Sequence, residues 1–318
     1  MESVKPQSMI FTLYGDYIRH AGGIIWINSL VRLLSYFGVP HKAVRSTIWR
    51  MKRNGLLRVD RIEKRSYYSL TPASMKIIQE TAARIFQFPP NRGPWDGQWH
   101  LVTYSVPENE REARDRLRRE LAWMGFGMLS NALWISPNDH RREIEHLSDS
   151  LGVRARIEIF IARHNGFSDP QTIVSRCWDL PTLNERYAAF IGKFARMYES
   201  HSYLLAGGKD IELSDYFVRR FVLVHQFRRF PYIDPGLPDE LLPSDWRGTE
   251  AATLFRKYHD LLTDKANTFF YSIYEKPTQQ PSDQESRNNQ TMEIGKQAIT
   301  PESYGRTTGG ASNVATRL

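Results

Sequence analysis

The clearest chemistry in this sequence belongs to a group of side chains between residues 42 and 53 that suits contact with a polyanion. If residues 41–54 form a helix, Val44, Ile48 and Met51 lie within about 60° of one another and make a core stripe. Cationic side chains and one indole then cover the rest of the helix, which is typical of a helix that enters the major groove of DNA. The candidate DNA contacts on this helix are Lys42, Arg45, Ser46, Trp49, Arg50 and Arg53.

A second cationic group follows directly. Residues 56–60 and 65–70 predict the two strands of a β-hairpin with a charged turn between them. The tip of such a hairpin would reach the phosphate backbone or the minor groove. The two tyrosines at 67 and 68 point to opposite faces, and the sequence leaves open which of them is core. For both cationic groups the alternative is a solvated basic face. The candidate DNA contacts on the hairpin are Arg58, Arg61, Lys64 and Arg65.

The elements that must position these side chains follow one another in an informative order. Apolar residues recur at helical spacing from Met9 to Tyr17, and residues 24–27 form a short apolar run. A second helix follows, for which Asn28 or Ser29 can serve as the cap. Helix, helix, short turn, helix and hairpin is the order of a winged helix-turn-helix domain, which we assign to residues 1–92.

The positive charge of the chain is concentrated in the same segment. The whole chain has a net charge of +8, and residues 1–90 hold 14 Lys and Arg against 5 Asp and Glu. The other 228 residues hold 29 Lys and Arg against 30 Asp and Glu. A local basic excess of this kind is typical of a surface that binds nucleic acid.

Residues 93–175 alternate between strand and helix patterns. The predicted elements are a strand over 99–106, a helix over 108–124, two short strands within 125–137, a helix over 139–151 and a strand over 154–162. This βαββαβ order predicts a ferredoxin-like fold, in which two helices cover one face of a four-stranded sheet. The other face must also be covered, commonly by a second copy, so we predict a homodimer.

The rest of the chain predicts a helical domain and a tail. Apolar residues recur at helical spacing over 184–199, 214–230 and 246–274, so residues 176–276 are assigned to a C-terminal helical domain. Residues 277–318 are poor in apolar side chains and are predicted to form a disordered tail. The predicted fold class is therefore α+β and multi-domain: a winged helix, a ferredoxin-like (Cas2-like) domain and a helical domain.

The sequence carries no enzyme signature. The GxSxG, GxxxxGK[ST] and HExxH motifs are absent, and the spacing of His140 and Glu143 is that of an ordinary helix surface. No catalytic residue, metal ligand or cofactor is therefore assigned. Ferredoxin-like domains resemble the metal-dependent nucleases of the Cas2 type, but the first strand here ends in Tyr104-Ser105-Val106, without the carboxylate that metal-dependent cleavage needs.

The composition also bears on where the chain works. The single cysteine, Cys177, excludes an internal disulfide framework and a multi-cysteine zinc site. No apolar run reaches the ~18 residues of a membrane span, and the first residues lack the layout of a signal peptide. These features predict a cytoplasmic protein without a membrane partner.

Several stretches of the chain together carry a family resemblance: Leu13-Tyr14-Gly15-Asp16-Tyr17, Ala43-Val44-Arg45-Ser46 with Tyr67-Tyr68-Ser69-Leu70-Thr71, Pro94-Trp95-Asp96-Gly97-Gln98-Trp99, and Phe227-Arg228-Arg229-Phe230-Pro231 through Asp245-Trp246-Arg247-Gly248. With these stretches, residues 8–275 resemble the PaaX family of bacterial transcriptional repressors, which control the degradation of phenylacetate and related aromatic acids. The resemblance implies a homodimer that binds a double-stranded operator and leaves it when an aryl-acyl-CoA thioester of the phenylacetyl-CoA type binds.

Such an effector carries several negative charges and an apolar acyl group, so it needs arginine or lysine beside aromatic side chains. The alternative for these residues is a helix whose aromatics are core and whose arginines are solvated. Two other functions stay open: a non-regulatory nucleic-acid-binding protein, such as an RNA-binding adaptor, and a Cas2-like metal-dependent nuclease. The effector candidates are Arg219, Arg220, Arg228, Arg229 and Tyr232.

Overall fold

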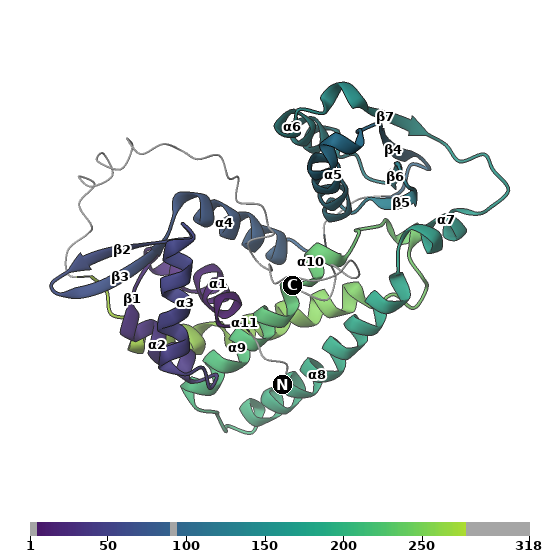
Figure 1. Cartoon of the computed structure of the whole chain (residues 1–318). Helices are drawn as coiled ribbons and strands as arrows, with labels where there is room; N and C mark the ends of the chain where they lie inside the picture. Colours follow the sequence, from purple (N-terminus) through teal and green to yellow (C-terminus); the bar gives the residue numbers. More distant parts are fainter. Residues whose placement is uncertain (1–4, 90–93, 278–318) are drawn as a thin grey trace. The chain divides into compact units, whose positions relative to one another are not determined.

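The computed structural model describes residues 5–89 and 94–277, and these residues form two compact units (Figure 1). The first unit comprises the described residues up to Phe86, the segment Met197–Phe227 and the described residues from Phe255 onward. The second unit comprises Gln87–Arg196 and Arg228–Leu254.

The N-terminal part of the first unit has the element order that the sequence predicts for a winged helix. Its three strands form an antiparallel sheet in the order β1-β3-β2, which places β3 in the centre and β2 at one edge (Figure 1). The elements are α1 Pro6–Asp16, η1 Ile18–Ala21, β1 Ile24–Trp26, α2 Ile27–Ser35, α3 His41–Arg53, β2 Leu57–Ile62, β3 Arg65–Leu70 and α4 Pro72–Phe86.

The apolar stripe of α3 and the turn of the hairpin determine how the two cationic segments are oriented. Val44, Ile48 and Met51 are buried, so the predicted stripe is confirmed. Thr47 is buried beside them, and the cationic side chains of α3 face outward. In the hairpin, Glu63 and Lys64 form the two-residue turn with φ angles of 49° and 65°. Positive φ at both positions is the geometry of a type I′ turn, whose twist matches that of the two strands.

The second unit contains the predicted ferredoxin-like sheet. Its four antiparallel strands have the order β5-β6-β4-β7, and α5 and α6 pack against one face (Figure 1). That face and its helices share a core that includes Val102, Leu117, Leu121, Trp134 and Ile144. The elements are β4 Trp99–Tyr104, η2 Glu108–Glu110, α5 Arg111–Trp123, β5 Gly127–Ser130, β6 Leu133–Ser136, α6 Arg141–Leu151, η3 Arg154–Arg156 and β7 Ile157–Ala162.

The opposite face of this sheet is largely covered by the chain itself. Trp99 and Ile135 on that face form a second core with Ile173 of α7 (Pro170–Cys177) and with Leu237 and Leu241. The expectation that this face needs a second copy to cover it is therefore wrong at these positions, because α7 and the segment around residues 237–241 already bury the apolar side chains. Phe160, on the edge strand β7, stays 52% exposed.

The C-terminal helices belong partly to each unit. The segment 197–227 and the described residues from 255 lie in the first unit, whereas 180–196 and 228–254 lie in the second. The segment expected to be one helical domain is thus divided in space. Most of the predicted tail, 277–318, lies outside the described residues. The elements are α8 Leu180–Ala206, α9 Leu213–Phe227, α10 Phe230–Ile233, η4 Asp239–Leu241 and α11 Gly248–Ile273.

Buried polar contacts attach the winged helix to α9 and to the end of α11 within the first unit. At the end of α1 the Asp16 carboxylate binds the guanidinium of Arg220 on α9, with Oδ1 2.8 Å from Nη2. The Tyr274 hydroxyl donates to the backbone oxygens of Ala21, at 2.6 Å, and of Ile24, at 2.9 Å. The helices of the C-terminal segment are therefore part of the structure that holds the cationic elements in place.

Candidate nucleic-acid interface

All ten candidate DNA contacts are exposed, six on α3 and four on the hairpin. The indole of Trp49 is 59% exposed, which is unusual for a side chain of that size. A helix of 13 residues that carries its apolar stripe inward and its cations outward has the dimensions to enter the major groove, which is about 12 Å wide. The residues assigned to α3 from the sequence therefore lie on one accessible surface.

The charges on α3 are not neutralised within the part of the chain that the structure describes. Within residues 5–89 and 94–277, no carboxylate lies within ion-pair distance of Lys42, Arg45, Arg50 or Arg53. Arg45 instead donates to the Asn28 side-chain oxygen at 2.8 Å, and the Arg53 guanidinium lies 4.7 Å from the centroid of the Trp49 ring. Phosphate groups of DNA would supply the missing counter-charge.

The hairpin places its cations unequally. Arg61 and Lys64 are exposed near the tip, and Arg58 donates to the Ser69 hydroxyl at 3.0 Å. Arg65 is already engaged, because it forms an ion pair with Glu275 and its guanidinium lies 4.6 Å from the centroid of the Trp26 ring. Arg65 is therefore less available to DNA than the other three hairpin cations.

The neighbouring tyrosines of β3 can now be distinguished. Tyr67 is 2% exposed and belongs to the core, whereas Tyr68 is half-buried. The backbone oxygen of Tyr68 accepts a hydrogen bond at 2.8 Å from the Tyr14 hydroxyl. The hairpin is thus bound to α1 through its second strand.

The effector candidates are divided between the two compact units. Arg219 and Arg220 belong to the first unit, and Arg228, Arg229 and Tyr232 belong to the second. Arg219 is half-buried with Nη1 3.5 Å from the Tyr258 hydroxyl, and the Tyr232 ring lies against Trp123. Arg228 is half-buried and Arg229 is exposed.

Arg220 is occupied by protein groups. It is 5% exposed and binds Asp16 and the side-chain oxygen of Asn267, the latter at 2.9 Å. Burial alone would raise the pKa of the Asp16 carboxyl, but a hydrogen bond from His259 and the charge of Arg220 outweigh burial and lower that pKa. In this structure the Arg220 guanidinium is therefore a structural cation and is not offered to a ligand.

The part of the chain that the structure describes contains no group of three or more His, Cys, Asp or Glu side chains that could hold a metal ion. Burial raises the pKa of the Cys177 thiol to about 11, which keeps it protonated near neutrality. None of the helices within residues 5–89 and 94–277 is both long enough and apolar enough to cross a membrane.

Comparisons with known proteins cover the three segments in turn. Residues 5–74 match the family description "PaaX-like protein", residues 92–174 match "PaaX protein central Cas2-like domain", and residues 178–272 match "PaaX-like protein C-terminal domain". The chain is 31% identical over 258 residues to the transcriptional repressor PaaX of Escherichia coli, which covers 79% of this chain and 78% of that protein. An uncharacterized protein from Mycobacterium tuberculosis shares the fold, with a TM-score of 0.56 and 21% identity, over 84% of this chain and 99% of that one.

Proposed function

The chain belongs to the PaaX family, and we propose that it is a transcriptional repressor that binds operator DNA through α3 and the β2–β3 hairpin. The observation that carries this proposal is the exposed face of α3, where Lys42, Arg45, Arg50 and Arg53 have no carboxylate partner among the described residues. In this arrangement α3 enters the major groove and reads base edges, while Arg61 and Lys64 contact the phosphate backbone.

We further propose that an aryl-acyl-CoA thioester releases the operator, as in a repressor of an aromatic-acid degradation operon. No catalytic step is needed, because release requires only that the effector binds the DNA-incompetent state more tightly. A change of about 100-fold in operator affinity corresponds to about 2.7 kcal/mol of coupling, and operator must then weaken effector binding by the same factor. The buried contacts between α1 and α9 support a route by which the C-terminal segment influences the winged helix.

The active form is proposed to be a homodimer. One helix and one hairpin cover only a few base pairs, which is too few for a unique genomic site. The edge strand β7 supports this proposal, because Phe160 and Ile161 are 52% and 64% exposed there. A dimer would bind an imperfect inverted repeat with half-sites about one or two helical turns apart.

The proposal is tested by footprinting the purified protein on the DNA upstream of its own gene, with and without phenylacetyl-CoA. A protected inverted repeat that disappears with the thioester supports the whole proposal. Protection of single-stranded RNA in preference to duplex DNA would instead indicate a nucleic-acid-binding adaptor. Cleavage of the probe in the presence of Mg²⁺ or Mn²⁺ would indicate a nuclease. Sedimentation of the protein–operator complex gives the number of copies bound, and one tightly bound copy would contradict the dimer.

Replacing Arg61 by alanine is expected to weaken binding to operator and to random DNA by the same factor, because a phosphate contact carries no sequence information. The same change should reduce the slope of log affinity against log salt by about 1. Fluorescence anisotropy over a range of salt concentrations measures both quantities. Ser66→Ala, a neutral substitution at the β3 position paired with Arg61, is the control. A changed base preference in Arg61→Ala would show that the hairpin reads sequence.

A further inference from the structure

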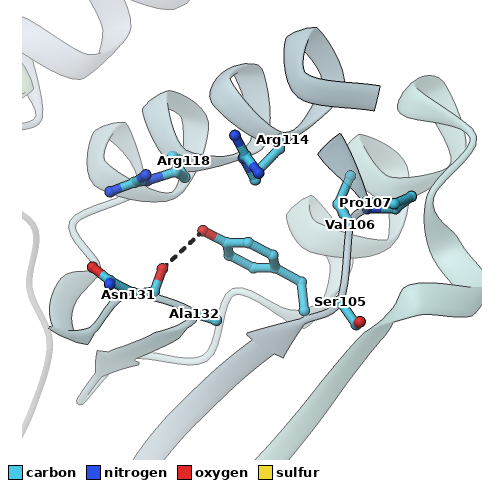
Figure 2. Close-up of a pocket in the computed structure, with 8 residues that line it drawn as sticks. Ser105, Val106, Pro107, Arg114, Arg118, Asn131 and Ala132 are labelled. Carbon is cyan, nitrogen blue, oxygen red and sulfur yellow. Dashed lines mark hydrogen bonds between the residues drawn. The ribbon is translucent and has the colours of Figure 1, made fainter. Parts of the chain in front are cut away.

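A pocket of about 480 Å³ opens in the Cas2-like domain beside the end of β4 (Figure 2). Its walls come from three places: the segment after β4, the helix α5 and the turn between β5 and β6. Figure 2 shows Arg114 and Arg118 on the helix side and Asn131 with Ala132 on the turn side. A volume of this size is within the range of pockets that hold small ligands and cofactors.

The helix wall of this pocket is positively charged. Arg114 and Arg118 are four residues apart on α5, so both project from the same face of the helix. Arg118 is half-buried and its Nη2 lies 3.5 Å from the sulfur of Met128. Of the residues described, no carboxylate lies within ion-pair distance of Arg118. A partly buried cation without a counter-charge favours an anion beside it.

Arg114 is held in place at the wall of the pocket. Its Nη1 donates to Glu108 at 2.8 Å, which holds the guanidinium in place. Its Nε is buried and has no hydrogen-bond acceptor among the described residues, since the carboxylate oxygen of Asp115 is 4.0 Å away and too far for a hydrogen bond. Because this nitrogen is also closed to solvent, Arg114 contributes to the pocket through its positive charge and not through its Nε.

The rest of the lining suits a ligand with both polar and apolar parts. Tyr104 is mostly buried and donates its hydroxyl to the backbone oxygen of Asn131 at 3.3 Å, which joins β4 to the opposite turn. Ser105 and Asn131 offer further polar side chains, and Val106 and Pro107 offer apolar surface. Paired guanidinium groups beside such a surface are the donors that recognise phosphate.

The pocket stands where a Cas2-type nuclease would need a carboxylate to hold its metal ion. Here the end of the strand is Tyr104-Ser105-Val106, and the nearest helix presents two arginines. Cations repel a divalent metal and attract an anion, so the chemistry of the site is the reverse of a metal centre.

The charge of the surrounding domain favours a small anion over DNA. Residues 93–175 hold 10 Lys and Arg against 12 Asp and Glu, so the domain as a whole does not attract a polyanion. A single phosphate or diphosphate group responds mainly to the two arginines that it touches, because more distant charges are screened.

We propose that this pocket binds a small phosphate-bearing molecule, with Arg118 and Arg114 contacting its phosphate group. If the effector is an aryl-acyl-CoA thioester, as proposed above, its diphosphate is the group that binds here; that identification rests on the proposed function, whereas the phosphate site itself does not. None of the five effector candidates assigned from the sequence lines this pocket, so substitutions at the two locations distinguish between them.

The test is calorimetry on the full-length chain with ADP, coenzyme A and inorganic phosphate as probes. Arg118→Gln is expected to weaken ADP and coenzyme A binding by 10-fold or more, and Arg118→Lys, which keeps the charge, should lose less. Arg142→Gln on α6 is the matched control, because it removes the same charge from an exposed position of the same domain and should change affinity less than 2-fold. Thermal unfolding of each variant checks that it is folded.

The outcomes distinguish a failure of the phosphate site from a failure of the proposed function. Arg118-dependent binding of ADP supports the phosphate site even if phenylacetyl-CoA fails to release the operator, in which case only the effector assignment falls. If inorganic phosphate binds but ADP and coenzyme A do not, the site accepts only the free ion, and the proposal of a larger phosphate-bearing ligand is overturned. Equal affinity of wild type and Arg118→Gln for ADP and coenzyme A overturns the proposal. The proposal is also overturned if the wild type binds none of the three probes. If Arg118→Gln then weakens operator binding, Arg118 is a DNA contact instead.

Discussion

Replacing Arg220 by methionine should lower the free energy of unfolding by about 3–5 kcal/mol. Asp16 and Arg220 are 3% and 5% exposed, and the carboxylate receives two hydrogen bonds from the guanidinium, at 2.8 and 3.1 Å. Methionine fills a similar volume but leaves the Asp16 charge buried without its guanidinium partner, and the Nε2 of His259 then lies 3.5 Å from the carboxylate. The penalty comes from that uncompensated charge more than from the lost contact.

A double-mutant cycle separates these two contributions. Asp16→Leu with Arg220→Met removes both charges, so the double variant should lose much less stability than the sum of the single variants. Arg32→Met is the matched control, since Arg32 is exposed on α2 and its replacement should change the free energy of unfolding by no more than about 0.5 kcal/mol. Chemical denaturation followed by circular dichroism gives the free energy of unfolding of the wild type, of both single variants, of the double variant and of the control. A cost below about 1 kcal/mol for Arg220→Met would show that the pair does not hold α1 to α9.

The sequence indicates that Arg220 is buried, but it does not reveal the partner of its guanidinium. Arg220 stands three residues after Phe217 and four before Val224, both buried, so a helical wheel already places it on the apolar side of α9. That signal argues against a solvent-facing phosphate contact. Its partner, Asp16, is 204 residues away in the sequence, and no local pattern links the two.

At the start of α2, tertiary contacts again override what the local sequence predicts. The sequence offers Asn28 or Ser29 as a cap, but α2 begins at Ile27 without a side-chain cap. Asn28 instead accepts a hydrogen bond from Arg45, and Ser29 donates to the backbone oxygen of Ile273 at 2.8 Å. Both side chains are used by partners that only the tertiary fold supplies, so their capping propensity is overridden.

The helix α3 was predictable because its signal is local. It packs one stripe on a core and leaves the rest in solvent, which makes the period of its apolar residues sufficient to place both faces. The pocket beside α5 was not predictable in this way. Its two arginines look like those of any charged helix surface, and the turn that closes the pocket is brought to them by the pairing of β5 and β6.

Alanine at Arg50 or Arg45 of α3 is expected to weaken operator binding by about 1–3 kcal/mol each, which corresponds to a factor between about 5 and about 150. The reason is that an arginine in the major groove donates two hydrogen bonds to one base edge, and alanine leaves that edge desolvated and unpaired. Trp49→Ala should have an effect of similar size, since the exposed indole offers contact area that alanine cannot replace. Binding to random DNA should fall much less, so the ratio of specific to random affinity is the quantity to measure.

Lys76→Ala on α4 is the matched control for the two arginine variants, because it removes a positive charge from an exposed site of the same unit. Affinities for the footprinted operator and for single-base variants of it, at one salt concentration, show which base each arginine reads. Loss of discrimination at one position in Arg50→Ala, with the other positions unaffected, is the expected signature of direct readout. An equal loss on operator and random DNA would make α3 a backbone contact, and the hairpin would then be the segment left to read sequence.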